Sequence, residues 1–211
     1  MNATPSHANE FLRALQTRAA RYGVRLDEEA LERLCQYYEQ VSDWNPRLHL
    51  VAPCSPSEFA TRHVLESLCA VPHLPENSRL ADVGSGAGLP VIPCLIVRPD
   101  LHATLIEASA KKSVFLRETL RRVTPDSNAV IINQRFETTA TPDVDVVTCR
   151  ALDRFTEKFE ELINWSPPAS TLLFFGGPSL REQIKAAGLP FSSLHLPESE
   201  QRYLFIVKRG D

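Results

Sequence analysis

Three glycines follow an acidic residue at every second position in the segment Asp82-Val83-Gly84-Ser85-Gly86-Ala87-Gly88-Leu89. Glycine lets a ligand approach the backbone closely, and a turn that leads from a strand into a helix points N–H groups at that ligand. The segment therefore predicts a loop that binds a small polar molecule at the end of a strand, with contacts from Asp82, Gly84, Gly86 and Gly88.

The glycine spacing distinguishes this loop from two other nucleotide-binding loops. The dinucleotide fingerprint G-x-G-x-x-G would need its third glycine at position 89, which is Leu89 in this chain. The Lys-Ser or Lys-Thr pair of phosphate loops does not follow the glycines either. The pattern disfavours nucleotide hydrolysis, and it leaves a nicotinamide-dependent oxidoreductase only as an alternative.

A second carboxylate supports a nucleoside-containing ligand. Glu107 stands 19 residues beyond Gly88, where the second strand of the predicted sheet ends. A carboxylate at that place can accept hydrogen bonds from both hydroxyls of a ribose. Together with Asp82 and the strand before it, Glu107 favours a cofactor loop over a turn that merely needs small residues.

The elements that position this loop form a doubly wound α/β sheet, because short apolar runs alternate with helical stretches from Arg79 onward. The last two strands have a polar turn between them and predict an antiparallel hairpin at the sheet edge. Buried parallel strands are expected at 80–83, 103–106, 129–132, 145–148 and 171–175, connecting helices at 89–97, 111–123 and 154–165, and the hairpin at 191–196 and 203–207. We assign this Rossmann-like domain to residues 76–211.

Residues 1–75 are expected to form an N-terminal helical extension. A first helix carries apolar residues from Phe11 to Ala19 and stops near Gly23. Asp27 is the predicted N-cap of a second helix. The segment Ser55-Pro56-Ser57-Glu58 is a capping box with proline at the first helical position, and it opens a third helix.

Composition sets limits on the class of protein. The 211 residues are 43% hydrophobic and 23% charged, which is typical of a soluble globular protein. The sequence shows neither a membrane span nor a signal peptide, so we expect a cytoplasmic protein. Five scattered cysteines without a C-x-x-C pair indicate reduced thiols, and no metal site is expected. A net charge of -3 means that any contact with nucleic acid needs a local basic patch.

With these residues in view, the chain resembles the small-subunit ribosomal RNA guanine-N7 methyltransferases, known as the RsmG or GidB family. The resemblance is collinear, covers nearly all of the chain from Trp44 onward, and implies a class I methyltransferase domain. The shared motifs are Trp44-Asn45, Arg62-His63-Val64-Leu65-Glu66-Ser67, Asp82 to Pro90, Arg98-Pro99, Lys111-Lys112, Phe115-Leu116-Arg117, Arg135-Phe136-Glu137 and Cys149-Arg150-Ala151.

The resemblance implies a cofactor, an acceptor and a set of contacts. The cofactor is S-adenosylmethionine, and the acceptor is N7 of a guanine in the 530-loop region of 16S ribosomal RNA, free or within the small ribosomal subunit. Cofactor contacts are implied at Gly84, Leu89, Phe136, Glu137 and Arg150, in addition to Glu107. Glu137 follows the third strand, where an acid commonly accepts a hydrogen bond from the adenine amino group. We expect the protein to be a monomer.

The implied reaction needs no general base, because N7 of guanine has a free lone pair at neutral pH. The protein then acts by positioning and by excluding water, and the candidates for positioning the substrate are His63, Lys111, Arg150 and Arg202. His63 is expected to orient a phosphate or a base, or to be a core residue.

A basic helix start points to an anionic partner. Lys111 and Lys112 begin a helix whose expected N-cap is Ser109, where a cation opposes the helix dipole by about 0.3–1 kcal/mol. An anion would offset that cost. We therefore expect Lys111 to meet RNA phosphates together with Arg62, Arg150 and Arg202.

The chain departs from the family pattern at four places. His49 replaces an asparagine, Glu66 an aspartate and Val91 a glycine, and Gly176-Gly177 replaces a Lys-Gly pair. The departures at His49 and Gly176 motivate a second hypothesis, a noncatalytic homologue that binds the cofactor or RNA. A methyltransferase for a small molecule is a further alternative, because the near-neutral charge does not demand RNA.

Overall fold

The computed structural model describes residues 6–150 and 155–210. Within them, seven strands form one sheet in the order β3-β2-β1-β4-β5-β7-β6. Strands β1 to β5 are parallel, and β7 runs antiparallel between β5 and β6. The predicted doubly wound sheet with a C-terminal hairpin is confirmed. The strands are β1 (Arg79–Val83), β2 (His102–Ile106), β3 (Asn128–Ile132), β4 (Val146–Arg150), β5 (Thr171–Gly176), β6 (Phe191–His195) and β7 (Tyr203–Lys208).

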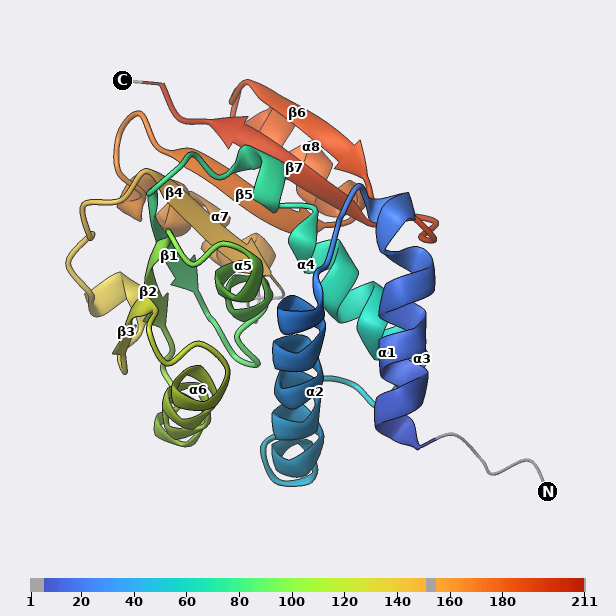
Figure 1. The fold of residues 1–211 in the computed structure, drawn as a ribbon. Coiled ribbons are helices and arrows are strands. Elements are labelled where there is room, and N and C mark those ends of the chain that lie inside the picture. The colour runs from blue at the N-terminus through green and yellow to red at the C-terminus, as the bar shows by residue number, and fades with distance from the viewer. Residues whose placement is uncertain (1–5, 151–154, 211) are drawn as a thin grey trace.

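Helices cover both faces of the sheet, and Figure 1 shows α7 and α8 on the side opposite α2, α5 and α6. The α-helices are α1 (His7–Arg18), α2 (Glu28–Leu48), α3 (Pro56–Glu58), α4 (Glu66–Leu68), α5 (Val91–Val97), α6 (Ala110–Val123), α7 (Phe155–Trp165) and α8 (Pro178–Ala186). Short 3₁₀ turns lie at η1 (Ala19–Tyr22), η3 (Val71–His73) and η4 (Phe136–Thr138), and a π-helix lies at η2 (Phe59–Leu65).

Successive strand residues serve two different cores, because neighbouring side chains in a strand point to opposite faces. On β1, Leu80 packs into the core that is shared with α1, α2, α4, α5 and α6, whereas Ala81 packs into the core under α7 and α8. The N-terminal helices belong to the first of these cores, in which Phe11 and Leu34 are fully buried together with Leu204 of β7. The extension and the sheet are therefore packed as one body, and the boundary at residues 75 and 76 stays a prediction.

The predicted caps of the N-terminal helices are present. The side chain of Asp27 accepts a hydrogen bond from the N–H of Ala30 at 2.8 Å and begins α2. The side chain of Ser55 accepts one from the N–H of Glu58 at 3.1 Å and begins α3. The third helix differs from the prediction because its middle is π-helical, with α3 before it and α4 after it.

Two further elements differ from the sequence-based expectation. Helix α8 was not expected, although Pro178 stands in its first turn and Leu180 and Ile184 bury one face. Helix α5 begins at Val91 and not at Leu89, because residues 86–90 still form the turn that precedes the helix. The expected start of the helix after β4, Arg154, and the motif residue Ala151 lie outside the described residues. Among residues 6–150 and 155–210, no helix has the length and apolar character needed to cross a bilayer.

Candidate functional site

The glycine loop leaves the sheet where its strand order reverses. Strand β1 has β2 on one side and β4 on the other, so the chain switches sides of the sheet at the carboxyl end of β1. In open α/β sheets, ligands bind at such a switch point, outside the carboxyl ends of the strands. The loop that follows Val83 lies there.

The loop needs its glycines for backbone reasons. Gly84, Gly86 and Gly88 have φ values of 72°, 53° and 83°, in the left-handed region that favours glycine. A Cβ on Gly88 would also overlap the side chain of Ile92, so this position serves close packing of α5 on the loop. By contrast, a Cβ on Gly86 would meet only the Gly84 carbonyl oxygen at 3.7 Å, and that position faces a cavity.

Glu107 closes the other side of the loop. Its Oε2 accepts a hydrogen bond from the N–H of Gly86 at 2.8 Å, and its Oε1 accepts one from the N–H of Ser109 at 2.7 Å. Asn133 donates from Nδ2 to the backbone carbonyl of Glu107 at 2.8 Å, which fixes the end of β2. A carboxylate oxygen can accept more than one hydrogen bond, so Glu107 is oriented by the protein and retains capacity for ligand hydroxyls.

Asp82 lies below the loop and is completely buried. Thr148 on β4 donates from Oγ1 to Asp82 Oδ1 at 2.6 Å, while Oδ2 has no hydrogen-bond partner among the described residues. Burial raises the pKa of this carboxyl to about 7. Asp82 is not among the residues that line the cavity, so its side chain supports the loop from behind.

A cavity of about 490 Å³ opens over the loop. It brings together six of the predicted site residues, His63, Gly84, Gly86, Leu89, Glu107 and Arg150. Another cavity, of about 520 Å³, lies at the amino ends of β2 and β3 and contains none of them. Size does not distinguish the two cavities, but the glycine loop, the fixed carboxylate and the basic rim are found only in the first. The remaining lining residues of that first cavity are Leu50, Val51, Ala52, Arg62, Ser85, Ala87, Ala108 and Lys112.

The cavity wall opposite Glu107 comes from the N-terminal extension. Asn45, near the end of α2, holds Val51 by accepting from its N–H at 2.9 Å and donating to its carbonyl at 3.1 Å. Tyr37, wholly buried in α2, donates its hydroxyl to the carbonyl of Ala87 in the glycine loop at 2.9 Å. The extension therefore positions the loop directly. No local pattern distinguishes Tyr37, because its partner is 50 residues away.

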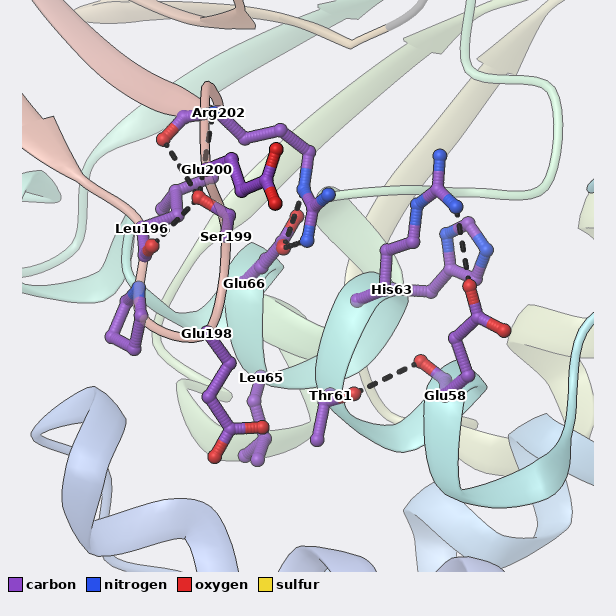
Figure 2. Close-up of polar contacts among 12 residues, drawn as sticks. Glu58, Thr61, His63, Leu65, Glu66, Leu196, Glu198, Ser199, Glu200 and Arg202 are labelled. Atoms are coloured by element: carbon purple, nitrogen blue, oxygen red, sulfur yellow. Dashed lines mark hydrogen bonds and ion pairs between the residues drawn. The ribbon is translucent and has the colours of Figure 1, made fainter.

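Glu66 organises the basic side of the cavity. Its carboxylate is 1% exposed, yet it pairs with two arginines that are distant in sequence, and Figure 2 shows the pair with Arg202. Arg202, which lies just before β7, donates from Nε to Oε1 of Glu66 at 2.9 Å. Arg150, at the end of β4, donates from Nη2 to Oε2 of Glu66 at 3.1 Å. Arg150 also donates to Ser67 Oγ at 3.2 Å and to the carbonyl of Arg62. Both arginines are thus engaged by the protein itself.

His63 lies on the π-helix η2 and lines the same cavity. Its ring is 5.1 Å from the ring of Phe59, centroid to centroid, and its Nδ1 is buried without a partner among the described residues. Burial lowers the pKa of His63, and together with the charges of Arg150, Arg62 and Arg202 it brings this pKa to about 3. The imidazole is therefore neutral at physiological pH.

The other predicted residues lie farther from this cavity. Phe136 is buried in the 3₁₀ turn after β3, with its ring 5.9 Å from that of Trp165. Glu137 forms an ion pair with Lys158 of α7. Neither Phe136 nor Glu137 lines the cavity, and their cofactor roles stay predictions. Lys111 is exposed at the start of α6, whereas its neighbour Lys112 lines the cavity. The expected N-cap is present, because Ser109 accepts from the N–H of Lys112 at 3.4 Å.

Two departures from the family pattern have a local explanation. His49 is the residue that ends α2, where it has a left-handed φ of 49°, and it is not part of the cavity lining. Gly176 ends β5, where a Cβ would overlap the side chain of Leu180 in α8. The packing of α8 therefore favours glycine over any larger residue at position 176.

Comparison with known proteins agrees with this geometry. A family model described as GidB, rRNA small subunit methyltransferase G, matches residues 30–200. Ribosomal RNA small subunit methyltransferase G of Xanthomonas axonopodis pv. citri is 36% identical over 192 residues, which cover 88% of this chain and 90% of that protein. The protein of the same name from Yersinia pseudotuberculosis serotype O:3 is 31% identical, with 88% of this chain and 93% of that protein covered.

Solved structures share the fold at low sequence identity. A ribosomal protein L11 methylase from Lactobacillus delbrueckii subsp. bulgaricus has a TM-score of 0.58 at 10% identity, covering 70% of this chain and 79% of that one. A methyltransferase from Pyrococcus furiosus has a TM-score of 0.57 at 12% identity, covering 85% and 99%. A protein-L-isoaspartate O-methyltransferase from Plasmodium falciparum, solved with S-adenosyl-L-homocysteine, has a TM-score of 0.51 at 18% identity, covering 81% and 84%.

Proposed function

Because the chain belongs to the GidB family of ribosomal RNA small subunit methyltransferases, we propose that it methylates N7 of a guanine in 16S ribosomal RNA with S-adenosylmethionine as the methyl donor. The observation that carries the proposal is the Glu107 carboxylate, held by the N–H groups of Gly86 and Ser109 at the rim of the cavity. A carboxylate fixed in this way at the end of the second strand suits a ribose diol.

The donor set of the cavity fits the ribose and the charged end of the cofactor. Glu107 can accept hydrogen bonds from ribose hydroxyls, and the backbone of Gly84 and Gly86 permits close approach of a ligand. Lys112 and Arg150 bring positive charge that suits a carboxylate. Leu50 and Leu89 provide apolar surface for the less polar parts of the ligand. Glu137 and Phe136 belong to the proposed cofactor site as an adenine-binding pair, although they lie outside the cavity lining.

The chemistry places few demands on side chains. The cofactor supplies an electrophilic methyl group bound to a sulfonium. The guanine N7 already has a lone pair, so no residue has to remove a proton from it. The tasks of this chain are to orient the two reactants in line and to keep water out, which is a positional and electrostatic form of catalysis. The absence of an acid–base dyad among the residues that line the cavity is consistent with these tasks.

Exposed basic side chains are the first candidates for contacts with RNA phosphates. Arg150 and Arg202 are engaged with Glu66, and Arg62 pairs with Glu58 at 3.2 Å in an exposed i,i+4 contact. An exposed pair is weak and can exchange its carboxylate for a phosphate. Lys111 has an exposed side chain next to the cavity rim. We therefore assign phosphate contacts first to Lys111 and Arg62, and we assign Arg150 and Arg202 to positioning.

Two measurements test the proposed function. Calorimetry should give tight binding of S-adenosylmethionine and much weaker binding of NAD, and the substitution Glu107→Gln should weaken cofactor binding by about 10-fold or more, because an amide nitrogen cannot accept hydrogen bonds. A preference for NAD would refute the assignment. Labelled methyl groups should then appear in 16S ribosomal RNA, supplied either free or as 30S particles. Tight cofactor binding without transfer to either would favour the noncatalytic reading.

We also propose that the protein is a monomer and acts in the cytoplasm, where ribosomes are assembled. Its support is that the cavity is built from a single chain, by the glycine loop, Glu107 and the extension. Light scattering at micromolar concentration should give the mass of one chain, and a dimer mass would correct this part of the proposal without affecting the cofactor assignment.

A further inference from the structure

The ring of His63 has an unmet hydrogen-bonding capacity next to the cofactor cavity. Its Nδ1 is buried and has no partner among the described residues, and the ring itself lines the cavity with Arg62, Arg150 and the glycine loop. Nδ1 has almost no accessible surface, so a ligand in the cavity can meet the ring only through its other nitrogen, Nε2. Figure 2 shows that His63 points away from the Arg202–Glu66 pair, although Glu66 is less than one helical turn later.

The π-helical turn contributes to this placement. An α-helix with the same sequence would give the segment a tighter turn, whereas η2 runs as a π-helix from Phe59 to Leu65. π-Helical segments are rare and occur frequently at functional sites. The backbone of this turn is also held from outside, because Arg150 donates a hydrogen bond to the carbonyl of Arg62. The position of His63 is therefore fixed by β4 as well as by its own helix.

The charged groups around His63 decide which ligand it suits. Arg62 lies on its own helix, Arg150 comes from β4 and Arg202 from the segment before β7, and all three disfavour a protonated ring. Glu58 is paired with Arg62, and Glu66 is paired with Arg150 and Arg202, so neither carboxylate is left for His63. The imidazole is therefore neutral at physiological pH. A neutral ring offers one donor and one acceptor, which suits the edge of a base and not the charge of a phosphate.

We infer that His63 positions the acceptor purine by a hydrogen bond from its neutral imidazole to the edge of the target base, an inference that rests on the proposed RNA methylation. In that reaction the bond from the sulfonium sulfur to the methyl carbon breaks as the bond from carbon to N7 forms. Positive charge moves onto the purine ring, and no proton is transferred to His63. A neutral partner holds the ring without repelling that charge, which an imidazolium would do.

Two substitutions separate hydrogen bonding from packing. His63→Gln keeps a donor and an acceptor near the position of Nε2, whereas His63→Phe keeps an aromatic ring and removes both polar atoms. With 30S particles as substrate, His63→Phe should lower kcat/KM by about 10- to 100-fold. His63→Gln should stay within about 3-fold of the native protein. Calorimetric affinity for S-adenosylmethionine should change by less than about 2-fold in either variant.

Each alternative outcome overturns the inference in a different way. If His63→Phe weakens cofactor binding as much as it lowers kcat/KM, the ring contacts the cofactor and not the base. If His63→Phe keeps native activity while His63→Gln loses it at an unchanged urea midpoint, ring packing and not hydrogen bonding is what matters. Native activity in both variants would show that the side chain of His63 has no role in the reaction. If the native protein binds the cofactor but methylates no RNA, it is the proposed function that fails.

Discussion

Arg202 donates a hydrogen bond from Nε to Oε1 of Glu66 at 2.9 Å across 136 residues of sequence. Arg150 binds the other oxygen of the same carboxylate, so one buried acid joins the helix that carries the cavity wall, the end of β4 and the C-terminal hairpin. Two guanidinium groups around one carboxylate leave a net positive charge beside the cavity. The arrangement gives the site both its rigidity and its sign of charge.

Replacing Glu66 should destabilise the protein strongly. The substitution Glu66→Ala removes the only carboxylate paired with Arg150 among the described residues, and the side chain of Arg150 is 12% exposed. Breaking a buried pair by removing one partner costs about 3–5 kcal/mol. The matched control is Glu58→Ala, whose exposed pair with Arg62 is worth less than about 1 kcal/mol. Urea unfolding of the two variants measures both values, and similar losses would contradict the structural role given to Glu66.

Asp82→Asn should change how stability depends on pH. Burial raises the pKa of Asp82 to about 7 from 3.8, so the folded protein holds a proton there that the unfolded chain has lost. The contribution of this proton to the free energy of unfolding is fully present below about pH 4 and is lost as the pH rises through about 7. Asparagine has no such proton, so between pH 5 and pH 8 the variant should gain on the order of 2 kcal/mol relative to the native protein. Urea unfolding at both pH values tests this, and a constant difference would rule out the raised pKa.

Lys111→Glu should weaken RNA binding and spare the cofactor. Lys111 is exposed at the start of α6, and reversing its charge should lower RNA affinity and make the logarithmic salt dependence shallower by about 0.7–0.9. Lys185→Glu is the matched control, because Lys185 is an exposed lysine on α8, on the opposite face of the sheet. Filter binding at several salt concentrations measures the slopes, and equal affinities for the two variants would remove Lys111 from the RNA interface.

His49→Gly should stabilise the protein without changing its activity. His49 ends α2 with a φ of 49°, a conformation that glycine adopts without the steric cost that a larger residue pays. The expected gain is about 0.5–1 kcal/mol in the free energy of unfolding. Gly23→Ala, at a φ of 69° with open space around its Cβ, should show the opposite sign. A loss of methyl transfer in His49→Gly would mean that His49 also acts in the site.

Local sequence patterns predicted the parts of the site that local geometry determines. The glycine spacing and the strand pattern located the loop, and Glu107 was found because parallel strands end at a common edge. Contacts between distant segments were beyond such reasoning. Arg150 and Arg202 were expected to meet RNA phosphates, whereas the structure pairs both with Glu66. Nothing near either arginine in the sequence indicates these ion pairs. Lys112, and not Lys111, lines the cavity, because the orientation of α6 sets which of two adjacent lysines faces inward.

The backbone also departed from its local pattern where packing intervened. The segment from Ser55 to Ala70 has the caps and spacing of one α-helix, yet its middle is π-helical where Arg150 and the cavity meet it. Helix α8 was not expected because it is short, and its apolar face consists mainly of Leu180 and Ile184. Neither feature follows from residue preferences alone.

The turn between β6 and β7 carries Glu198, which points toward the N-terminal helices in Figure 2 and binds Arg18 and Arg21, 180 and 177 residues earlier. Ribosomes release a chain from its amino end, so α1 is synthesised long before its partner in the hairpin exists. A nascent chain can pack α1 on α2 early, because Phe11 stacks on Tyr38 with ring centroids 4.6 Å apart, but the two ion pairs of Glu198 form only when almost the last residues have been added. An interrupted translation product would therefore retain the glycine loop and its contact with Tyr37, and it would lack the ion pairs that fasten Arg18 and Arg21 to the hairpin.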